Sequence, residues 1–207
     1  MIIILAGATG LVGGKILDLL LKYPEIESIT AFARKKQEIS NPKLSWVIGD
    51  LPPESIPKAD ALIMAIGTTI AKAGSKGAFF QTDVEIPYKL AVLTKNAGVS
   101  QVLNVSAKGA NLKSSIFYNR AKAELEKRLI DLNFNKTIII RPSLLLGERK
   151  ENRPGEKIGQ WIFRNLNFLF PKSIQAVSAE AVAMTIVRAL LSKNQGLRII
   201  ENQEIFS

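Results

Sequence analysis

Short apolar segments alternate with longer stretches of helical periodicity through most of this 207-residue sequence. Several apolar segments, such as IIILA at Ile2–Ala6 and ALIMAI at Ala61–Ile66, contain no polar residue. Strands have this composition when helices cover both faces of a parallel sheet. The pattern therefore predicts an α/β fold with a doubly wound parallel sheet.

The expected elements follow the same alternation along the chain. Strands are expected at Ile2–Ala6, Ser28–Ala33, Leu44–Ile48, Ala61–Ile66, Gln101–Val105, Thr137–Ile140 and Arg198–Glu201. Helices are expected at Leu11–Lys22, Glu85–Ala97, Asn119–Leu132 and Ala179–Leu191. No repeat or linker divides the chain, so we expect a single domain over residues 1–207. Residues 148–175 interrupt the alternation, and we expect them to form a small C-terminal elaboration.

The sequence contains no histidine and no cysteine. This excludes a Ser-His-Asp triad, a cysteine nucleophile and the usual zinc sites. A magnesium site made only of carboxylates stays open, but we assign no residue to a metal. Acid–base chemistry in this chain would have to use Tyr, Lys, Asp or Glu.

Nothing in the sequence resembles a membrane span or a secretory signal. The apolar run Ile2–Ala6 is far too short to cross a bilayer, and it lacks the basic flank of a signal peptide. We therefore expect a cytoplasmic protein with no membrane span.

A glycine-rich turn follows the first expected strand, with the sequence Gly7-Ala8-Thr9-Gly10-Leu11-Val12-Gly13. Gly7 permits a tight turn, Gly10 permits close approach of a pyrophosphate, and Gly13 permits close packing of the helix on the sheet. The free N–H groups at the start of the following helix favour phosphate. Between a strand and a helix, this GxxGxxG pattern predicts a Rossmann-type dinucleotide site. The alternative is a glycine-rich turn that binds no ligand.

The second expected strand ends in Ala33-Arg34-Lys35-Lys36, where an NAD-type site would place an acidic residue. A guanidinium matches a 2′-phosphate in geometry and charge. Arg34 and Lys35 therefore favour NADP(H) over NAD(H). The alternative is a solvated basic run at the end of a strand.

Tyr118 and Lys122 are four residues apart in an expected helix, so they lie on one face. Ser106 follows the strand Gln101–Val105, which places its hydroxyl at the carboxyl edge of the sheet, where open α/β folds bind ligands. An ammonium beside a phenol favours the phenolate. Tyr118 could therefore protonate a substrate oxygen, with Lys122 holding the cofactor and Ser106 hydrogen-bonding the substrate. The alternative is a surface Lys and a Tyr packed on the sheet.

Together these motifs resemble the short-chain dehydrogenase/reductase superfamily. The resemblance rests on GATGLVG at Gly7–Gly13, Ser106 with Tyr118-x-x-x-Lys122, and Arg141-Pro142. Further segments, including VSAKGA at Val105–Ala110 and RPSLLLG at Arg141–Gly147, are similar to the atypical NAD(P)H-binding subgroup of the oxidoreductase Tat-interacting protein and NmrA-like proteins.

This resemblance implies a role for each matching position. The pyrophosphate would be lined by Gly7, Thr9, Gly10, Leu11, Val12 and Gly13. Arg34, with Lys35, would bind the 2′-phosphate, and Asp50 and Leu51 would lie by the adenine. Ala65, Ile66 and Gly67 would flank the adenosine ribose, Pro142 would approach the nicotinamide, and Tyr118 and Lys122 would contact the cofactor. An asparagine that relays protons in the superfamily cannot be placed in this sequence.

The net charge of +10 invites a nucleic-acid interpretation. The excess is concentrated after residue 105, partly in the basic and aromatic segment Glu148–Lys172. Ile158, Trp161, Ile162 and Leu166 have helical spacing there, so we favour a helix packed on the domain. A substrate lid is the second interpretation, and nucleic-acid binding is the last, because no nucleic-acid motif is found.

These patterns lead to two functional hypotheses. The first is an NADPH-dependent oxidoreductase that reduces a small carbonyl compound with Ser106, Tyr118 and Lys122. The second is an NADP(H)-binding regulator or scaffold with little or no turnover. In the first case the partner is a small-molecule substrate, and whether the chain is a monomer or a homodimer stays open in both.

Overall fold

The computed structural model describes residues 1–35, 37–146, 171 and 175–205. Its strands are β1 (Ile2–Ala6), β2 (Ser28–Ala33), β3 (Leu44–Ile48), β4 (Ala61–Met64), β5 (Gln101–Val105), β6 (Lys136–Arg141), β7 (Leu145–Leu146), β8 (Val177–Ser178) and β9 (Gly196–Glu201). Its helices are α1 (Leu11–Leu20), α2 (Ile70–Ala73), α3 (Lys76–Phe80), the π-helical turn η1 (Gln81–Glu85), α4 (Ile86–Asn96), α5 (Phe117–Asp131), α7 (Ala179–Leu191) and α8 (Asn202–Ile205).

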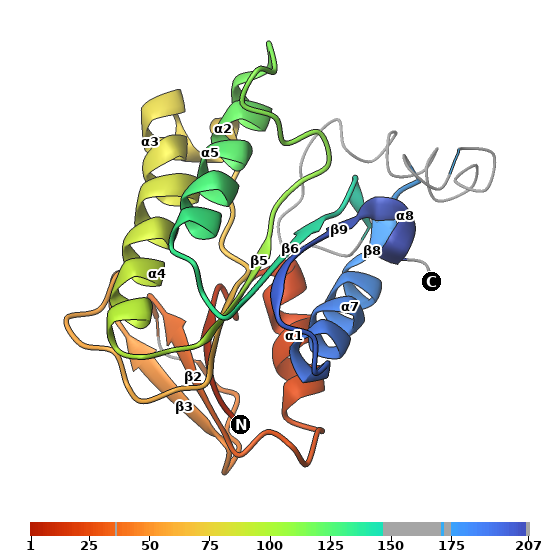
Figure 1. Ribbon diagram of the computed structural model, residues 1–207. Helices are drawn as coiled ribbons and strands as arrows, with labels where there is room; N and C mark the ends of the chain where they lie inside the picture. The colour runs from red at the N-terminus through yellow and green to blue at the C-terminus, as the bar shows by residue number, and fades with distance from the viewer. Residues whose placement is uncertain (36, 147–170, 172–174, 206–207) are drawn as a thin grey trace.

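Within these residues, seven strands form one sheet in the order β3-β2-β1-β4-β5-β6-β9. Each neighbouring pair is parallel, so the carboxyl ends of all these strands meet at one edge (Figure 1). The order reverses between β1 and β4, which is the topological switch point where doubly wound folds bind dinucleotides. The predicted Rossmann-type parallel sheet is confirmed.

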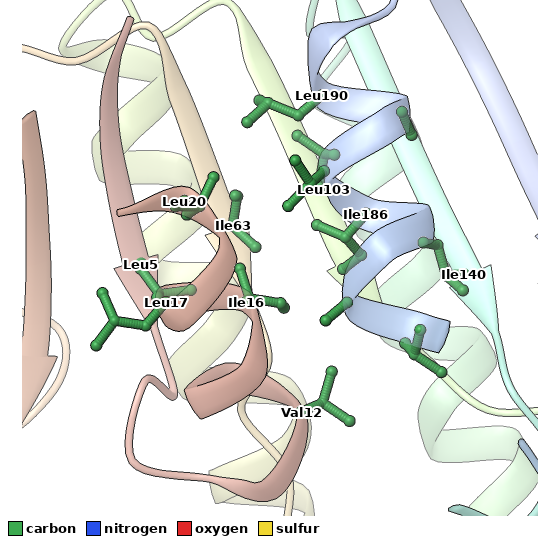
Figure 2. Close-up of a cluster of buried hydrophobic side chains, with 14 of the residues drawn as sticks. Leu5, Val12, Ile16, Leu17, Leu20, Ile63, Leu103, Ile140, Ile186 and Leu190 are labelled. Atoms are coloured by element: carbon green, nitrogen blue, oxygen red, sulfur yellow. The ribbon is translucent and has the colours of Figure 1, made fainter. Parts of the chain in front are cut away.

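Helices cover both faces of the sheet (Figure 1). Helices α1 and α7 lie side by side on one face, over alternate strand residues such as Ile3 and Leu5 (Figure 2). Helices α3, α4 and α5 lie on the other face, over the intervening residues such as Ile4. Because successive strand residues point to opposite faces, both sets are buried, which explains the unbroken apolar composition of these strands.

Several element boundaries differ from the sequence prediction, and two of these differences bear on the site. Strand β4 ends at Met64, before Ala65 and Ile66, because the chain turns there against the glycine loop. The helix expected from residue 85 begins at Lys76, where the Ser75 hydroxyl caps α3 by accepting a hydrogen bond from the Ala78 N–H. The expected start at Glu85 is the last residue of the π-helical turn, inside a longer helical segment.

The expected elaboration at residues 148–175 falls outside the described residues, apart from residues 171 and 175. Its form and role therefore stay predictions. In the described parts of the chain, no helix is long and apolar enough to cross a membrane.

Candidate functional site

The glycine loop between β1 and α1 is built from close backbone contacts. Gly7 has a φ of +90°, and a methyl group on it would lie 2.5 Å from the backbone carbon and oxygen of Ala65. A methyl group on Gly13 would lie 2.0 Å from the Gly7 carbonyl oxygen. The Gly10 N–H donates a hydrogen bond of 2.9 Å to that same oxygen. Only glycine fits at Gly7 and Gly13 without displacing backbone.

The first turn of α1 is suited to an anion. Its N-cap is Gly10, no side chain caps the helix, and no acidic residue lies in its first turn. A helix start of this kind offers backbone N–H groups and a positive dipole end to phosphate. Thr9 and Gly10 are exposed and Leu11 is half-buried, whereas Val12 packs its side chain in the core. Val12 could therefore contribute only backbone atoms to a phosphate site.

The residues expected around adenosine lie at the same edge of the sheet. Arg34 and Lys35 are exposed and follow β2 directly. Ala33, the last residue of β2, is opposite Ile48 of β3, and its carbonyl accepts a 3.0 Å hydrogen bond from Gly49. Asp50, which is exposed, and Leu51, which is half-buried, therefore come out of the sheet beside Arg34.

The loop after β4 lies between the glycine loop and α5. The Ala65 N–H donates to the Ala6 carbonyl at 2.8 Å, which continues the β1–β4 pairing by one residue. Ile66 is half-buried. A methyl group on Gly67 would lie 3.7 Å from Asp83 Oδ1 and 3.9 Å from Lys122 Nζ, so Gly67 faces η1 and α5 and not the glycine loop. The three residues expected at the adenosine ribose therefore connect the glycine loop to the Tyr-Lys pair.

Tyr118 and Lys122 lie one turn apart in the first half of α5. Lys122 Nζ is 5.8 Å from the centre of the Tyr118 ring, and that ring packs on Phe79 at 5.5 Å between centres. Lys122 is buried, whereas Tyr118 is half-buried. Lys122 Nζ donates to Asp83 Oδ1 at 2.6 Å. The predicted pair is thus brought together, with a carboxylate that the sequence analysis did not assign to the site.

Ser106 is also buried at the carboxyl end of β5, but its hydroxyl donates to Glu126 Oε1 of α5. Glu126 accepts two further hydrogen bonds from Arg141, from Nε at 3.1 Å and from Nη2 at 2.6 Å. Arg141 also donates to Glu201 at 2.9 Å. Hydrogen bonding to Glu126 raises the pKa of the Arg141 guanidinium. In this arrangement Ser106 offers its lone pairs, and not its proton, to any other group.

Pro142 is buried directly after β6. Its carbonyl accepts a 2.8 Å hydrogen bond from the Lys108 N–H, and the Ser106 N–H donates to the Ile140 carbonyl at 2.8 Å. These bonds continue the β5–β6 pairing past the ends of both strands. Pro142 and Ser106 are therefore neighbours at the edge of the sheet where the nicotinamide is expected.

Asp83 and Glu126 were not among the site residues expected from the sequence. Glu126 lies in α5 eight residues after Tyr118, but its carboxylate is paired with Arg141 of β6, and the helical repeat of α5 gives no sign of that contact. Asp83 was placed before the expected helix. The Ser75 cap was the signal that could have extended that helix and put Asp83 one turn after Phe79.

A groove with a volume of about 390 Å³ has the Glu126–Arg141 pair in its wall. It is lined by residues of α5, β9 and the segment before α5, including Leu112, Ile130 and Ile199. No glycine-loop residue lines it, so it is distinct from the expected dinucleotide site. Among the described residues, no three His, Cys, Asp or Glu side chains cluster closely enough to hold a metal ion.

Comparison with known proteins places this geometry in context. A family model described as NAD(P)H-binding matches residues 7–193. "Protein FMP52, mitochondrial" of Candida albicans is 37% identical over 171 residues, which cover 75% of this chain and 74% of that protein. Proteins with the same name match from Lodderomyces elongisporus and Meyerozyma guilliermondii.

Two solved structures illustrate the shared fold. The human epimerase family protein SDR39U1 with NADPH has a TM-score of 0.66 at 16% identity, covering 99% of this chain and 77% of that one. The UDP-N-acetylglucosamine 4-epimerase of Methanobrevibacter ruminantium has a TM-score of 0.72 at 15% identity, covering 97% and 76%. The resemblance found in the sequence is thus confirmed by the matching family model and by the fold.

The expected cytoplasmic location is wrong. The similar fungal proteins are named mitochondrial, which contradicts a cytoplasmic location. The prediction failed because the lack of a membrane span or secretory signal cannot distinguish one water-filled compartment from another.

Proposed function

Because the chain belongs to the NAD(P)H-binding family whose model spans residues 7–193, we propose that it is an NADPH-dependent oxidoreductase acting on a small carbonyl compound. The observation that carries the proposal is the place of the Tyr118–Lys122 pair. It lies on α5 against the Ala65–Gly67 loop, which in turn touches the glycine loop. In this proposal Tyr118 is the proton donor, and the nicotinamide end of the site is the sheet edge where Ser106 and Pro142 are neighbours.

The residues present fit a dinucleotide. Gly7 and Gly13 let the glycine loop, the Ala65 backbone and helix α1 pack closely, and the uncapped start of α1 favours a pyrophosphate. We assign the 2′-phosphate to Arg34, which is exposed at the end of β2 and carries a permanent charge. This assignment supports NADPH over NADH. The neighbour SDR39U1, whose structure contains NADPH, is consistent with it, whereas other neighbours contain NAD.

When bound, the cofactor would supply a hydride to the carbonyl carbon of the substrate. The Tyr118 hydroxyl would then donate its proton to the carbonyl oxygen. The positive charge of Lys122 would stabilise the phenolate that this transfer leaves on Tyr118. The Lys122 N–H groups that do not bind Asp83 would donate to a ribose of the cofactor. Ser106 would hydrogen-bond the substrate oxygen, which requires its hydroxyl to turn from Glu126. Burial of Ser106 and Lys122 keeps water from these groups.

The test compares Tyr118→Phe with the matched variant Tyr88→Phe on α4. NADPH oxidation is followed at 340 nm over a panel of aldehydes, ketones and quinones. Loss of the proton donor should lower turnover by about 10²- to 10⁴-fold, while the Kd for NADPH stays within about twofold. Tyr88→Phe should leave both unchanged. Full activity in Tyr118→Phe would refute the catalytic role of this tyrosine.

The second candidate function is an NADP(H)-binding regulator or scaffold. In the structure, the other two residues of the proposed catalytic set already have carboxylate partners. Ser106 donates to Glu126, and Lys122 donates to Asp83, which favours this second function. A site with these groups occupied could bind a dinucleotide without turning over substrate. Silence across the substrate panel, together with a protein partner captured only in the presence of NADPH, would select this function.

A further inference from the structure

The side chain of Asp83 is buried between the loop after β4 and helix α5, with 1% of its surface exposed. One oxygen accepts the 2.6 Å hydrogen bond from Lys122 Nζ. The other accepts a 2.9 Å hydrogen bond from the backbone N–H of Thr68. A single carboxylate therefore joins the helix of the Tyr-Lys pair to the loop expected at the adenosine ribose.

The local structure directs Asp83 to this place. It lies in the π-helical turn Gln81–Glu85, between α3 and α4. Such a turn adds a residue to the helical repeat, so it changes which side chains face the core, and it is frequent at functional sites. Phe79 and Val84 are buried with Asp83, so the carboxylate enters an apolar surrounding. A charge there requires the two hydrogen-bond donors that it has.

The nearby charged groups are paired elsewhere. Glu85, two residues after Asp83, accepts from Arg128, which also pairs with Glu124. Glu126 pairs with Arg141. Lys76 and Arg120 lie over the ring of Phe117. The Asp83–Lys122 contact is therefore separate from the other ion pairs of α5.

We propose that Asp83 is a positioning residue of the dinucleotide site. By holding Lys122 Nζ and the Thr68 N–H on one carboxylate, it sets the separation between the ammonium and the ribose loop. Gly67 lies between them without a side chain, so the loop backbone is in reach of the pair. Only a carboxylate accepts from both donors, because an asparagine would turn its NH₂ toward one of them. The inference rests on the proposed binding of NADPH.

A double-mutant cycle on NADPH affinity tests the inference. The variants are Asp83→Asn, Lys122→Met and the double variant, and the Kd is measured by fluorescence titration. Asp83→Asn should weaken NADPH binding about tenfold or more, as expected for loss of a charge-assisted contact. If Asp83 acts through Lys122, the double variant should lose far less than the product of the two single losses. A loss equal to that product, or an unchanged Kd in Asp83→Asn, would overturn the proposal.

The control is Asp131→Asn. Asp131 pairs with Lys127 at 2.5 Å in the same helix, but its side chain is 57% exposed. Its replacement should leave the Kd within about twofold. Asp83→Asn leaves Lys122 buried without a counterion. If that variant does not fold, the double variant, which removes both charges, takes its place in the test. It must then bind NADPH about as well as Lys122→Met, and a much weaker affinity would overturn the inference.

Failure of this inference differs from failure of the proposed function. If the unmodified protein does not bind NADPH, the function is rejected and the inference with it. If the unmodified protein and Asp83→Asn bind NADPH equally, only the positioning role is rejected.

Discussion

Replacing Gly13 by alanine should damage the glycine loop, although alanine is the better residue for a helix. The added methyl group would lie 2.0 Å from the Gly7 carbonyl oxygen and 2.6 Å from the Gly7 carbonyl carbon, whereas ordinary van der Waals contact begins at 3.4 Å. Both atoms belong to the backbone, so no change of side-chain rotamer relieves the overlap. Helix α1 must shift away from the loop, or Gly7 must move.

The size of the effect follows from two opposing terms. Overpacking of a close contact costs about 1–3 kcal/mol. The helix propensity of alanine returns up to about 1 kcal/mol relative to glycine. Because the overlap is with two backbone atoms, its cost lies at the upper end of that range, so we expect Gly13→Ala to lower the free energy of unfolding by about 2 kcal/mol, and the Tm by about 4–8 °C for a chain of this length.

Gly14 provides the matched control, because it is the next residue in the same helix. A methyl group there would meet only the Ala8 carbonyl oxygen, at 3.6 Å. Gly14→Ala should therefore raise the free energy of unfolding by about 0.5–1 kcal/mol. Thermal unfolding followed by circular dichroism, with NADPH titration beside it, measures both effects. Gly13→Ala should also weaken NADPH binding about tenfold or more. A Gly13→Ala protein with a Tm at or above that of the unmodified protein would refute the reasoning.

Two further predictions concern charged residues. Arg34→Ala should remove most of the preference for NADPH over NADH, because it deletes the cation assigned to the 2′-phosphate; an unchanged ratio of the two Kd values would argue against that assignment. Glu126→Gln should lower the free energy of unfolding by about 3 kcal/mol, because it leaves the largely buried Arg141 without its main carboxylate, and denaturant unfolding measures this. Glu124→Gln, at a more exposed ion pair of α5, should cost only about 0.5 kcal/mol, and equal losses in the two variants would contradict the argument.

The sequence predicted those parts of the fold that depend on local pattern. Strand β1 and the glycine loop were recognised because an apolar run followed by closely spaced glycines has few structural interpretations. The positions of Tyr118 and Lys122 on one helical face followed from the helical repeat. Ser106 was placed correctly at the end of β5, where strand and turn meet.

The polar contacts of the site could not be predicted in the same way. Lys122 and its partner Asp83 are 39 residues apart, and Ser106 and Glu126 are 20 residues apart. Sequence periodicity carries no information about which acidic residue of one helical segment will face a given lysine of another. The π-helical turn that brings Asp83 inward also breaks the regular repeat on which helix prediction depends.

The sequence by itself determined the parallel sheet, the glycine loop and the edge at which the site lies, because these follow from period-two and period-3.6 patterns and from the conformations open to glycine. The tertiary structure alone decided which partners the proposed catalytic side chains have. It turns the Ser106 hydroxyl to Glu126 and the Lys122 ammonium to Asp83. The physical reason is burial: a charge or hydroxyl removed from water takes whichever partner the packing of distant elements brings within reach.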